Sequence, residues 1–351
     1  MTIQTATQFG VSNTPWSSGR SVRDVATMKE AMEIANLDFT VETAPVYQKV
    51  QPLTGSMIRE AVDQVEGNTA DDMKLMIESL MAKCYQAVNS HNVIRREDNN
   101  KVYGVCGNRW EPLQNTDAFD WFQPALDAGL VKLDTVGSLH GGRKIWILAE
   151  LCSPPEEVVK GDPIAKYIIL GNGHNGSTAI FVGFTPIRVW CANQFPRLAR
   201  CENSSLIRLR HTKHAKVQLD NLRDIMDNAN AEFSATVDQY RHLVNYTVNQ
   251  TDLEKYVKVL FCNKAERETP LADLSARRRN MLESVLELVD TGIGLQDEKI
   301  KGTWYAAFNA VNQYLNYSAG RSVDGRLDSL WFGQNSTTNQ KALDEALKLA
   351  V

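Results

Sequence analysis

A dense run of cationic side chains lies between Pro186 and Lys216. It holds seven Arg or Lys residues and one acid, a net charge of +6 in a chain whose total is −4. Cations that follow a phosphate backbone, beside flat rings on which bases can stack, are what sequence-tolerant single-strand binding requires. The residues predicted to contact single-stranded DNA combine this run with a preceding hairpin: Arg143, Lys144, Arg188, Arg208, Arg210 and Lys213, with Trp190 as a stacking ring.

A second interpretation of the same run stays open. The cations could form a surface stripe paired with acids from elsewhere in the chain, and the aromatic rings Trp146, Trp190 and Phe195 could belong to the core. Composition alone favours neither interpretation, because an electrostatic field depends on how charges cluster in space. A stripe of this kind would suit an acidic protein partner as well as DNA.

Histidine offers a different chemistry. His211 and His214 form an HxxH pair, and His140 and His174 lie in separate glycine-containing turns. A metal centre needs a third Cys, His or carboxylate ligand that converges with such a pair, and the spacing identifies none. We therefore expect no catalytic residue, no metal and no cofactor. The sequence leaves open whether His140, His174 and His211 converge.

The glycine-rich segment 171–177, GNGHNGS, could suggest a phosphate cradle. A P-loop, however, requires GxxxxGK[ST] between a strand and a helix. Here both flanks have the composition of strands and the segment contains no Lys. Asn-Gly between two apolar runs instead predicts a β-hairpin turn, with His174 exposed at its tip.

The composition excludes several classes of protein. Of 351 residues, 43% are hydrophobic and 23% are charged, as in an ordinary globular protein. No apolar run approaches the roughly 20 residues that span a bilayer, and the first residues lack the features of a secretory signal. The six cysteines are scattered without a CxxC pair, which indicates reduced thiols. We expect a soluble, cytoplasmic protein.

The elements that would position these residues change type along the chain. Residues 56–92 are predicted to be helical, with a break near Gly67, and alternation from residue 93 predicts antiparallel strands. In the segment 145–149, Ile145 and Ile147 should face one side of the sheet and Trp146 and Leu148 the other. Helical spacing dominates after residue 215, and a last helix at 338–350 is expected after a loop rich in Asn, Ser and Thr.

These patterns predict an α+β fold, with a central antiparallel β-sheet and helices followed by a mostly helical C-terminal half. Three domains are expected. They are an N-terminal segment with a strand and inserted helices (1–92), an antiparallel β-rich core with the basic stretch (93–215), and a helical C-terminal region (216–351).

Several runs of this sequence resemble the phage/plasmid-like protein family known as domain of unknown function 932. They are APVY near residue 44, GNRWEPLQN at 107–115, TVGSLHGGRKIWILAEL, YIILGNGHNGSTAIFVGFTPIRVWCANQF, IRLRHTKHA, GTWYAAFNAVNQYLNY at 302–317 and RLDSLWFG at 326–333. The helical stretch at 56–92 departs from the family's pattern and resembles an insertion. The resemblance implies a role in the DNA metabolism of a phage or other mobile element.

The order of elements is also similar to that of phage single-strand annealing proteins of the Redβ and Erf kind. That similarity implies ATP-independent annealing of single-stranded DNA in recombination or replication, by a homo-oligomer arranged as a ring or filament. It implies no bound nucleotide. No membrane partner is expected, because the sequence has no apolar run long enough to span a bilayer. Two alternatives remain, namely a phage structural or host-interaction protein without DNA binding, and a metal-dependent nucleic-acid-modifying enzyme.

Overall fold

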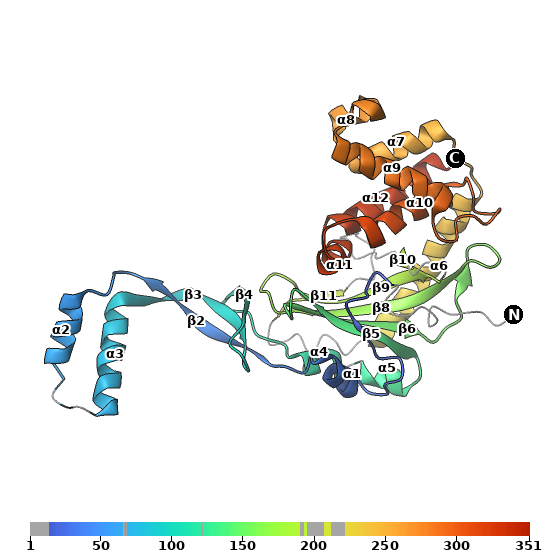
Figure 1. The fold of residues 1–351 in the computed structure, drawn as a ribbon. Coiled ribbons are helices and arrows are strands. Elements are labelled where there is room, and N and C mark those ends of the chain that lie inside the picture. Colours follow the sequence, from blue (N-terminus) through green and yellow to red (C-terminus); the bar gives the residue numbers. More distant parts are fainter. Residues whose placement is uncertain are drawn as a thin grey trace.

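The computed structural model describes residues 14–65, 67, 69–120, 122–189, 193–194, 207–211 and 222–351. Within them, an eight-stranded sheet lies at the centre of the body and carries helices on both faces. A long arm projects from one end of this body (Figure 1). Antiparallel strands dominate the N-terminal half and helices the C-terminal half, which confirms the predicted α+β class.

The central sheet is antiparallel throughout its described pairings. Its strand order is β1-β5-β6-β8-β9-β10, with β11 also paired to β9 and β7 to β8. The hairpin β8–β9 closes over the glycine-rich segment, as predicted. The strands are β1 (Arg20–Ser21), β5 (Val131–Leu139), β6 (Lys144–Leu151), β7 (Glu156–Glu157), β8 (Pro163–Gly173), β9 (Ile180–Arg188), β10 (Asn193–Gln194) and β11 (Ile207–Leu209).

Alternate residues of the strands belong to two separate hydrophobic cores. Ile145 and Ile147 are buried with the N-terminal helices, whereas Trp146 and Leu148 are buried with the C-terminal helices. This confirms the predicted assignment of faces. Burial on both sides removes nearly the whole apolar surface of the strands from water. The N-terminal helices are α1 (Met28–Ala35), α4 (Asn115–Asp120) and α5 (Gln123–Asp127).

The second face of the sheet is covered by the C-terminal helices (Figure 1). The rings of Trp146 and Trp331 meet edge to face with centroids 5.1 Å apart, which joins β6 to this layer. The helices are α6 (Leu222–Val244), α7 (Gln250–Phe261), α8 (Lys264–Glu268), α9 (Ala276–Thr291), α10 (Trp304–Gln313), α11 (Val323–Phe332) and α12 (Gln334–Leu349), with a 3-10 turn η4 (Leu271–Asp273) and a π-helical turn η5 (Tyr314–Ser318).

The arm is a β-ribbon that ends in a helical hairpin. Strand β3 pairs with both β2 and β4, and the two helices follow β2 at the far end (Figure 1). Thr69 and Asp72 form a reciprocal capping box at the start of the second helix. Residue 92, a predicted domain boundary, lies inside β3. The elements are β2 (Val41–Lys49), α2 (Gly55–Asp63), α3 (Ala70–Cys84), β3 (Tyr85–Arg96) and β4 (Val102–Gly107).

Two predicted element boundaries are wrong. The predicted helix at 56–92 ends at Cys84, because residues 85–92 pair with β2 and the segment is rich in Asn, Ser and Val, which form helices weakly. The predicted Asn/Ser/Thr loop before residue 338 is already part of α12. Ser336, Thr338 and Asn339 of this helix are buried, and Asn312 donates to Asn339 at 2.8 Å, so tertiary packing overrides local propensity.

Candidate nucleic-acid interface

One end of the central sheet brings together turns that are far apart in the sequence. Lys144, at the start of β6, pairs with Gly173 at the end of β8, and Ile180, at the start of β9, pairs with Leu209 of β11. The β5–β6 turn, the β8–β9 turn and the end of β11 therefore lie along one edge of the sheet. Four of the predicted contacts fall there: Arg143, Lys144, Arg208 and Arg210.

Three of these four cations are exposed. Arg143 lies in the β5–β6 turn, and Arg208 and Arg210 share one face of the chain at β11 because side chains alternate along a strand. Within the described residues, the guanidinium groups of Arg143 and Arg210 form no hydrogen bond or ion pair. They can therefore bind a phosphate oxygen without first breaking an internal contact.

Lys144 is placed differently. It is 8% exposed, its Nζ forms an ion pair with Oδ1 of Asp328 on α11, and it lies 4.6 Å from the centre of the Phe332 ring. These contacts direct the ammonium toward the C-terminal helices. Its role in this structure is to join β6 to α11, and a phosphate could reach it only if the ion pair opened.

Arg188 is buried at the opposite end of β9, with 1% of its surface exposed. Its Nε donates to Oδ1 of Asp162 at 2.7 Å, and its terminal nitrogens donate to the carbonyls of Ile293 and Gly294. Burial raises the pKa of Asp162, whereas the Arg188 charge and a hydrogen bond from Tyr305 lower it. Arg188 therefore holds the sheet to the C-terminal helices and is not accessible to DNA in this structure.

The remaining two predicted contacts, Trp190 and Lys213, lie outside the described residues. The same holds for Phe195 and for His214 of the HxxH pair. Of the seven residues predicted to bind DNA, the structure brings three exposed arginines to one edge of the sheet and assigns two cations to internal ion pairs.

His174 is buried rather than exposed, so the prediction for this residue is wrong. Its Nε2 donates to Oδ1 of Asn115 at 2.7 Å, and its ring stacks on Tyr103 with centroids 6.3 Å apart. The physical reason is that β4 of the arm packs over the β8–β9 turn. Burial, and secondarily the neighbouring His211, lower the pKa of His174 to about 3, so the ring is neutral.

His211 is also buried, and its ring stacks on Trp110 with centroids 5.0 Å apart. Neither ring nitrogen of His211 has a partner in hydrogen-bonding geometry. The backbone groups of Thr178 and Glu111 nevertheless lie close enough to raise the pKa of the ring. Burial lowers the pKa of His211 to about 4 against the opposing effect of those backbone groups. His174 and His211 therefore lie in one buried region as two neutral rings.

His140 does not join the other two histidines. Its backbone N–H donates to Oδ2 of Asp324 at 3.0 Å, and its Nε2 lies 3.2 Å from Oδ2 of Asp328. The side chain therefore faces α11. In the described ranges, no group of three His, Cys, Asp or Glu side chains is arranged to hold a metal ion.

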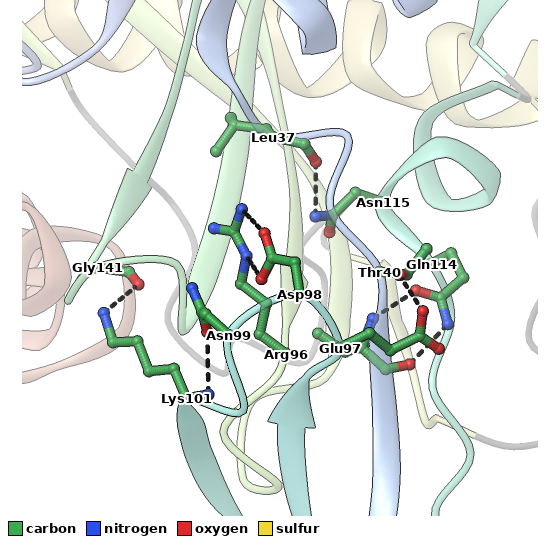
Figure 2. A network of polar contacts seen from close by, with 11 residues as sticks. Leu37, Thr40, Arg96, Glu97, Asp98, Asn99, Lys101, Gln114, Asn115 and Gly141 are labelled. Atoms are coloured by element: carbon green, nitrogen blue, oxygen red, sulfur yellow. Dashed lines mark hydrogen bonds and ion pairs between the residues drawn. The ribbon is translucent and has the colours of Figure 1, made fainter.

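Polar contacts attach the arm to the body beside this edge of the sheet (Figure 2). Lys101 Nζ donates to the carbonyl of Gly141 at 3.0 Å, in the turn that also carries Arg143. The Gln114 side chain donates to the carbonyl of Val41 at 2.8 Å and accepts from its N–H at 3.0 Å. These bonds fix the start of β2 and the β3–β4 turn at the base of the arm.

A second set of contacts stiffens the β3–β4 turn itself. Two nitrogens of the Arg96 guanidinium each lie 2.7 Å from an oxygen of Asp98 (Figure 2). The guanidinium carbon lies 4.2 Å from the centre of the Phe39 ring. A bidentate pair of this kind has a defined geometry. It holds the turn that presents Lys101 to the body.

Two further cations at this edge were missed in the sequence. Lys101 is exposed beside the β5–β6 turn, and Arg109 is exposed next to Trp110, whose ring stacks on His211 adjacent to Arg210. In the sequence, each of them is an isolated charge. Lys101 belongs to the polar turn after β3, and Arg109 belongs to the GNRW segment. Only the packing of the arm against the sheet brings them near the predicted arginines.

No helix among the described residues combines the length and the apolar character that crossing a bilayer requires. This agrees with the absence of a long apolar run in the sequence.

Comparison with known proteins identifies a family but no characterised relative. No curated protein and no solved structure matches this chain. One family model matches residues 102–331, a range that begins at β4 and includes the central hairpins and most of the C-terminal helices. The ribbon strands β2 and β3 and the helices α2 and α3 precede it. Because the match covers more than half of the chain, this protein belongs to the family described as Domain of unknown function (DUF932).

Proposed function

We propose that this protein binds single-stranded DNA along the exposed edge of its central sheet. The proposed surface, called here the basic rim, consists of Lys101, Arg109, Arg143, Arg208 and Arg210. The observation that carries the proposal is that three arginines predicted from the sequence lie at the same edge of the sheet, where two further exposed cations join them. Such a cluster can follow a phosphate backbone independently of base sequence.

The sequence around β11 supports the same assignment. Arg197 and Arg200 precede this strand in the chain, and Lys213 and Lys216 follow it. These four residues add to the positive charge of the sequence around β11 and lie outside the described part of the chain. Trp110, half-buried beside Arg109, offers a ring near the rim. Base stacking on such rings is tolerant of sequence.

We further propose that binding needs no nucleotide and serves annealing of complementary strands, in a phage or another mobile element. The sequence contains no GxxxxGK[ST] motif, the usual cradle for the phosphates of ATP. A protein that holds one strand by its backbone leaves the bases free to pair. This is the chemical requirement for annealing without an energy source.

The test is fluorescence anisotropy with a labelled 30-mer, as a single strand and as a duplex, at several salt concentrations without nucleotide. We expect the single strand to bind more tightly and its affinity to fall with salt. The double variant Arg208→Glu, Arg210→Glu should bind at least about tenfold more weakly and should reduce the salt slope by about 1.4, because each lost phosphate contact contributes about 0.7.

The matched control is Lys255→Glu, Lys264→Glu, which makes the same change in net charge at exposed positions of α7 and α8. It should leave affinity and salt slope unchanged. Equal weakening by both double variants would mean that only net charge matters and would remove the basic rim as the site. Absence of binding to either form of DNA at low salt would overturn the function, and an interaction with an acidic protein would then become the better explanation.

A further inference from the structure

The end of the arm carries an unusually apolar surface. Its helices α2 and α3 lie well away from the central sheet (Figure 1). Six large hydrophobic side chains of this helical hairpin are more than 40% exposed: Ile58, Val62, Met73, Leu75, Ile77 and Met81. A monomeric protein rarely exposes a contiguous group of this kind, and such patches commonly mark interaction surfaces.

The hairpin has very little core of its own. Only Ala61, Leu80 and Cys84 are buried among its described residues. A helical unit of this size does not bury enough apolar surface to be stable without additional packing. The two helices together therefore resemble half of a helical bundle, in which one long side lacks its partner.

The exposed side chains define one principal face. A groove on the other side of the hairpin is lined by Ala61, Gln64, Val65, Asp72, Leu75, Met76 and Ser79. Ile58 and Val62 of α2 do not line that groove. Neither do Met73, Ile77 and Met81, which recur at every fourth position of α3. Residues four positions apart differ in direction by only about 40° around the helix axis, so their side chains form a single stripe. The principal face consists of Ile58, Val62, Met73, Ile77 and Met81.

Charges beside the stripe make this face complementary to itself. Lys74 and Glu78 are both exposed on the flank of the stripe that lies away from the residues buried toward α2. Within the described part of the chain, neither makes an ion pair or hydrogen bond. In an antiparallel pair of identical helices, the same flanks of the two copies face each other. A two-fold axis close to Ile77 would then place each Lys74 opposite the Glu78 of the other copy.

We propose that the principal face is where two copies of this chain associate. In the proposed dimer, α3 packs antiparallel against α3 of the second copy, Ile77 lies near the axis, and the four helices form one bundle. A two-fold interface requires a surface that is complementary to itself, and the stripe with its opposite charges meets that requirement. The proposal does not depend on the proposed DNA binding, since the arm end is remote from the basic rim.

The first test measures the mass of the full-length protein in solution by light scattering after gel filtration, and the dissociation constant by sedimentation equilibrium. The wild-type protein should be dimeric at micromolar concentration. Ile77→Asp should weaken association by at least about tenfold, because a charge near the axis would be buried without a partner. The matched control is Leu75→Asp, on the groove side of the same helix and 67% exposed, which should remain dimeric.

The second test exchanges the flanking charges. Lys74→Glu and Glu78→Lys should each weaken association. In either variant, residue 74 of one copy and residue 78 of the other would carry the same charge. The double variant should restore it, because the opposite pairs are regained with their positions exchanged. Rescue of this kind depends on the antiparallel geometry and would not follow from a loss of folding, which circular dichroism of each variant checks independently.

A wild-type protein that stays monomeric at 100 µM would overturn the proposal. So would equal weakening by Ile77→Asp and Leu75→Asp, or a double charge exchange that gives no recovery. Anisotropy with the 30-mer separates the two proposals. Failure of the basic rim variants to affect DNA binding would leave the dimer measurements unchanged, and Ile77→Asp should retain single-strand affinity per protomer within about threefold.

Discussion

The hydroxyl of Tyr305 on α10 donates to Oδ2 of Asp162 at 2.9 Å, while Oδ1 of the same carboxylate accepts from Arg188 at the end of β9. This buried carboxylate therefore connects the central sheet with the C-terminal helices. Both members of the ion pair are almost fully removed from water. Charges buried to this degree persist only when each is paired and hydrogen-bonded.

Asp162→Ala should destabilise the protein by about 3–5 kcal/mol, because it leaves the Arg188 guanidinium buried without a counter-ion. Tyr305→Phe should cost about 1 kcal/mol, the usual value of one hydrogen bond. Urea unfolding followed by circular dichroism measures both. Arg143→Ala in an exposed turn serves as the control and should change stability by less than about 0.5 kcal/mol. A loss below about 1 kcal/mol for Asp162→Ala would contradict the assigned role.

Lys144 and Arg143 are neighbours in sequence, but we expect Lys144 to contribute to stability and Arg143 to contribute to DNA binding. Lys144→Met should reduce the stability by about 1 kcal/mol through loss of the Asp328 ion pair and leave the salt dependence of DNA binding unchanged. Arg143→Ala should leave stability unchanged and reduce the salt slope by about 0.7. Unfolding curves and anisotropy on the same two variants decide this. A reversed pattern would mean that Lys144 leaves its ion pair to bind DNA.

Acid should weaken the junction between arm and body. The folded-state pKa values of His174 and His211 are lowered to about 3 and about 4, below the ordinary value of about 6.5. The unfolded chain therefore binds more protons as the pH falls below 6.5, and stability is full above that pH. Each histidine should reduce the stability by about 2 kcal/mol between pH 6.5 and pH 5.

His211→Phe keeps a ring against Trp110 and removes one titrating group. Its urea midpoint should change less between pH 7.5 and pH 5 than that of the wild-type protein. Equal pH dependence in His211→Phe and the wild-type protein would refute a buried neutral His211.

Gly104 in β4 and Gly176 in the β8–β9 turn allow the backbones of the arm and the turn to approach closely, since a Cβ at Gly104 would overlap the carbonyl oxygen of Asn175. A Cβ at Gly176 would overlap the carbonyl oxygen of Val105, and Gly176 has a φ of +77°. Gly176→Ala should therefore destabilise the protein by about 1–3 kcal/mol. Gly107→Ala, at the end of β4 where an added methyl group would enter open space, should be neutral. Thermal unfolding compares them, and equal melting temperatures would contradict the close packing described here.

Local pattern alone was enough for the α+β class and for the assignment of faces. The alternation of Ile145, Trp146, Ile147 and Leu148 predicts two apolar faces because side chains point to opposite sides of a strand. The segment GNGHNGS predicts a hairpin because Asn and Gly suit tight turns between strands. Both predictions depend only on residues that are near one another in the chain, and the structure confirms both.

Tertiary structure decided which cations are exposed and which histidines meet. Arg188 is buried because its partners, Asp162 and the carbonyl of Ile293, come from distant segments. His174 is buried because β4 covers its turn, and Lys101 reaches the rim because the arm docks beside Gly141. Charge and spacing along a sequence indicate which groups are available. Their pairing and burial depend on contacts between segments far apart in the chain, which no local pattern encodes.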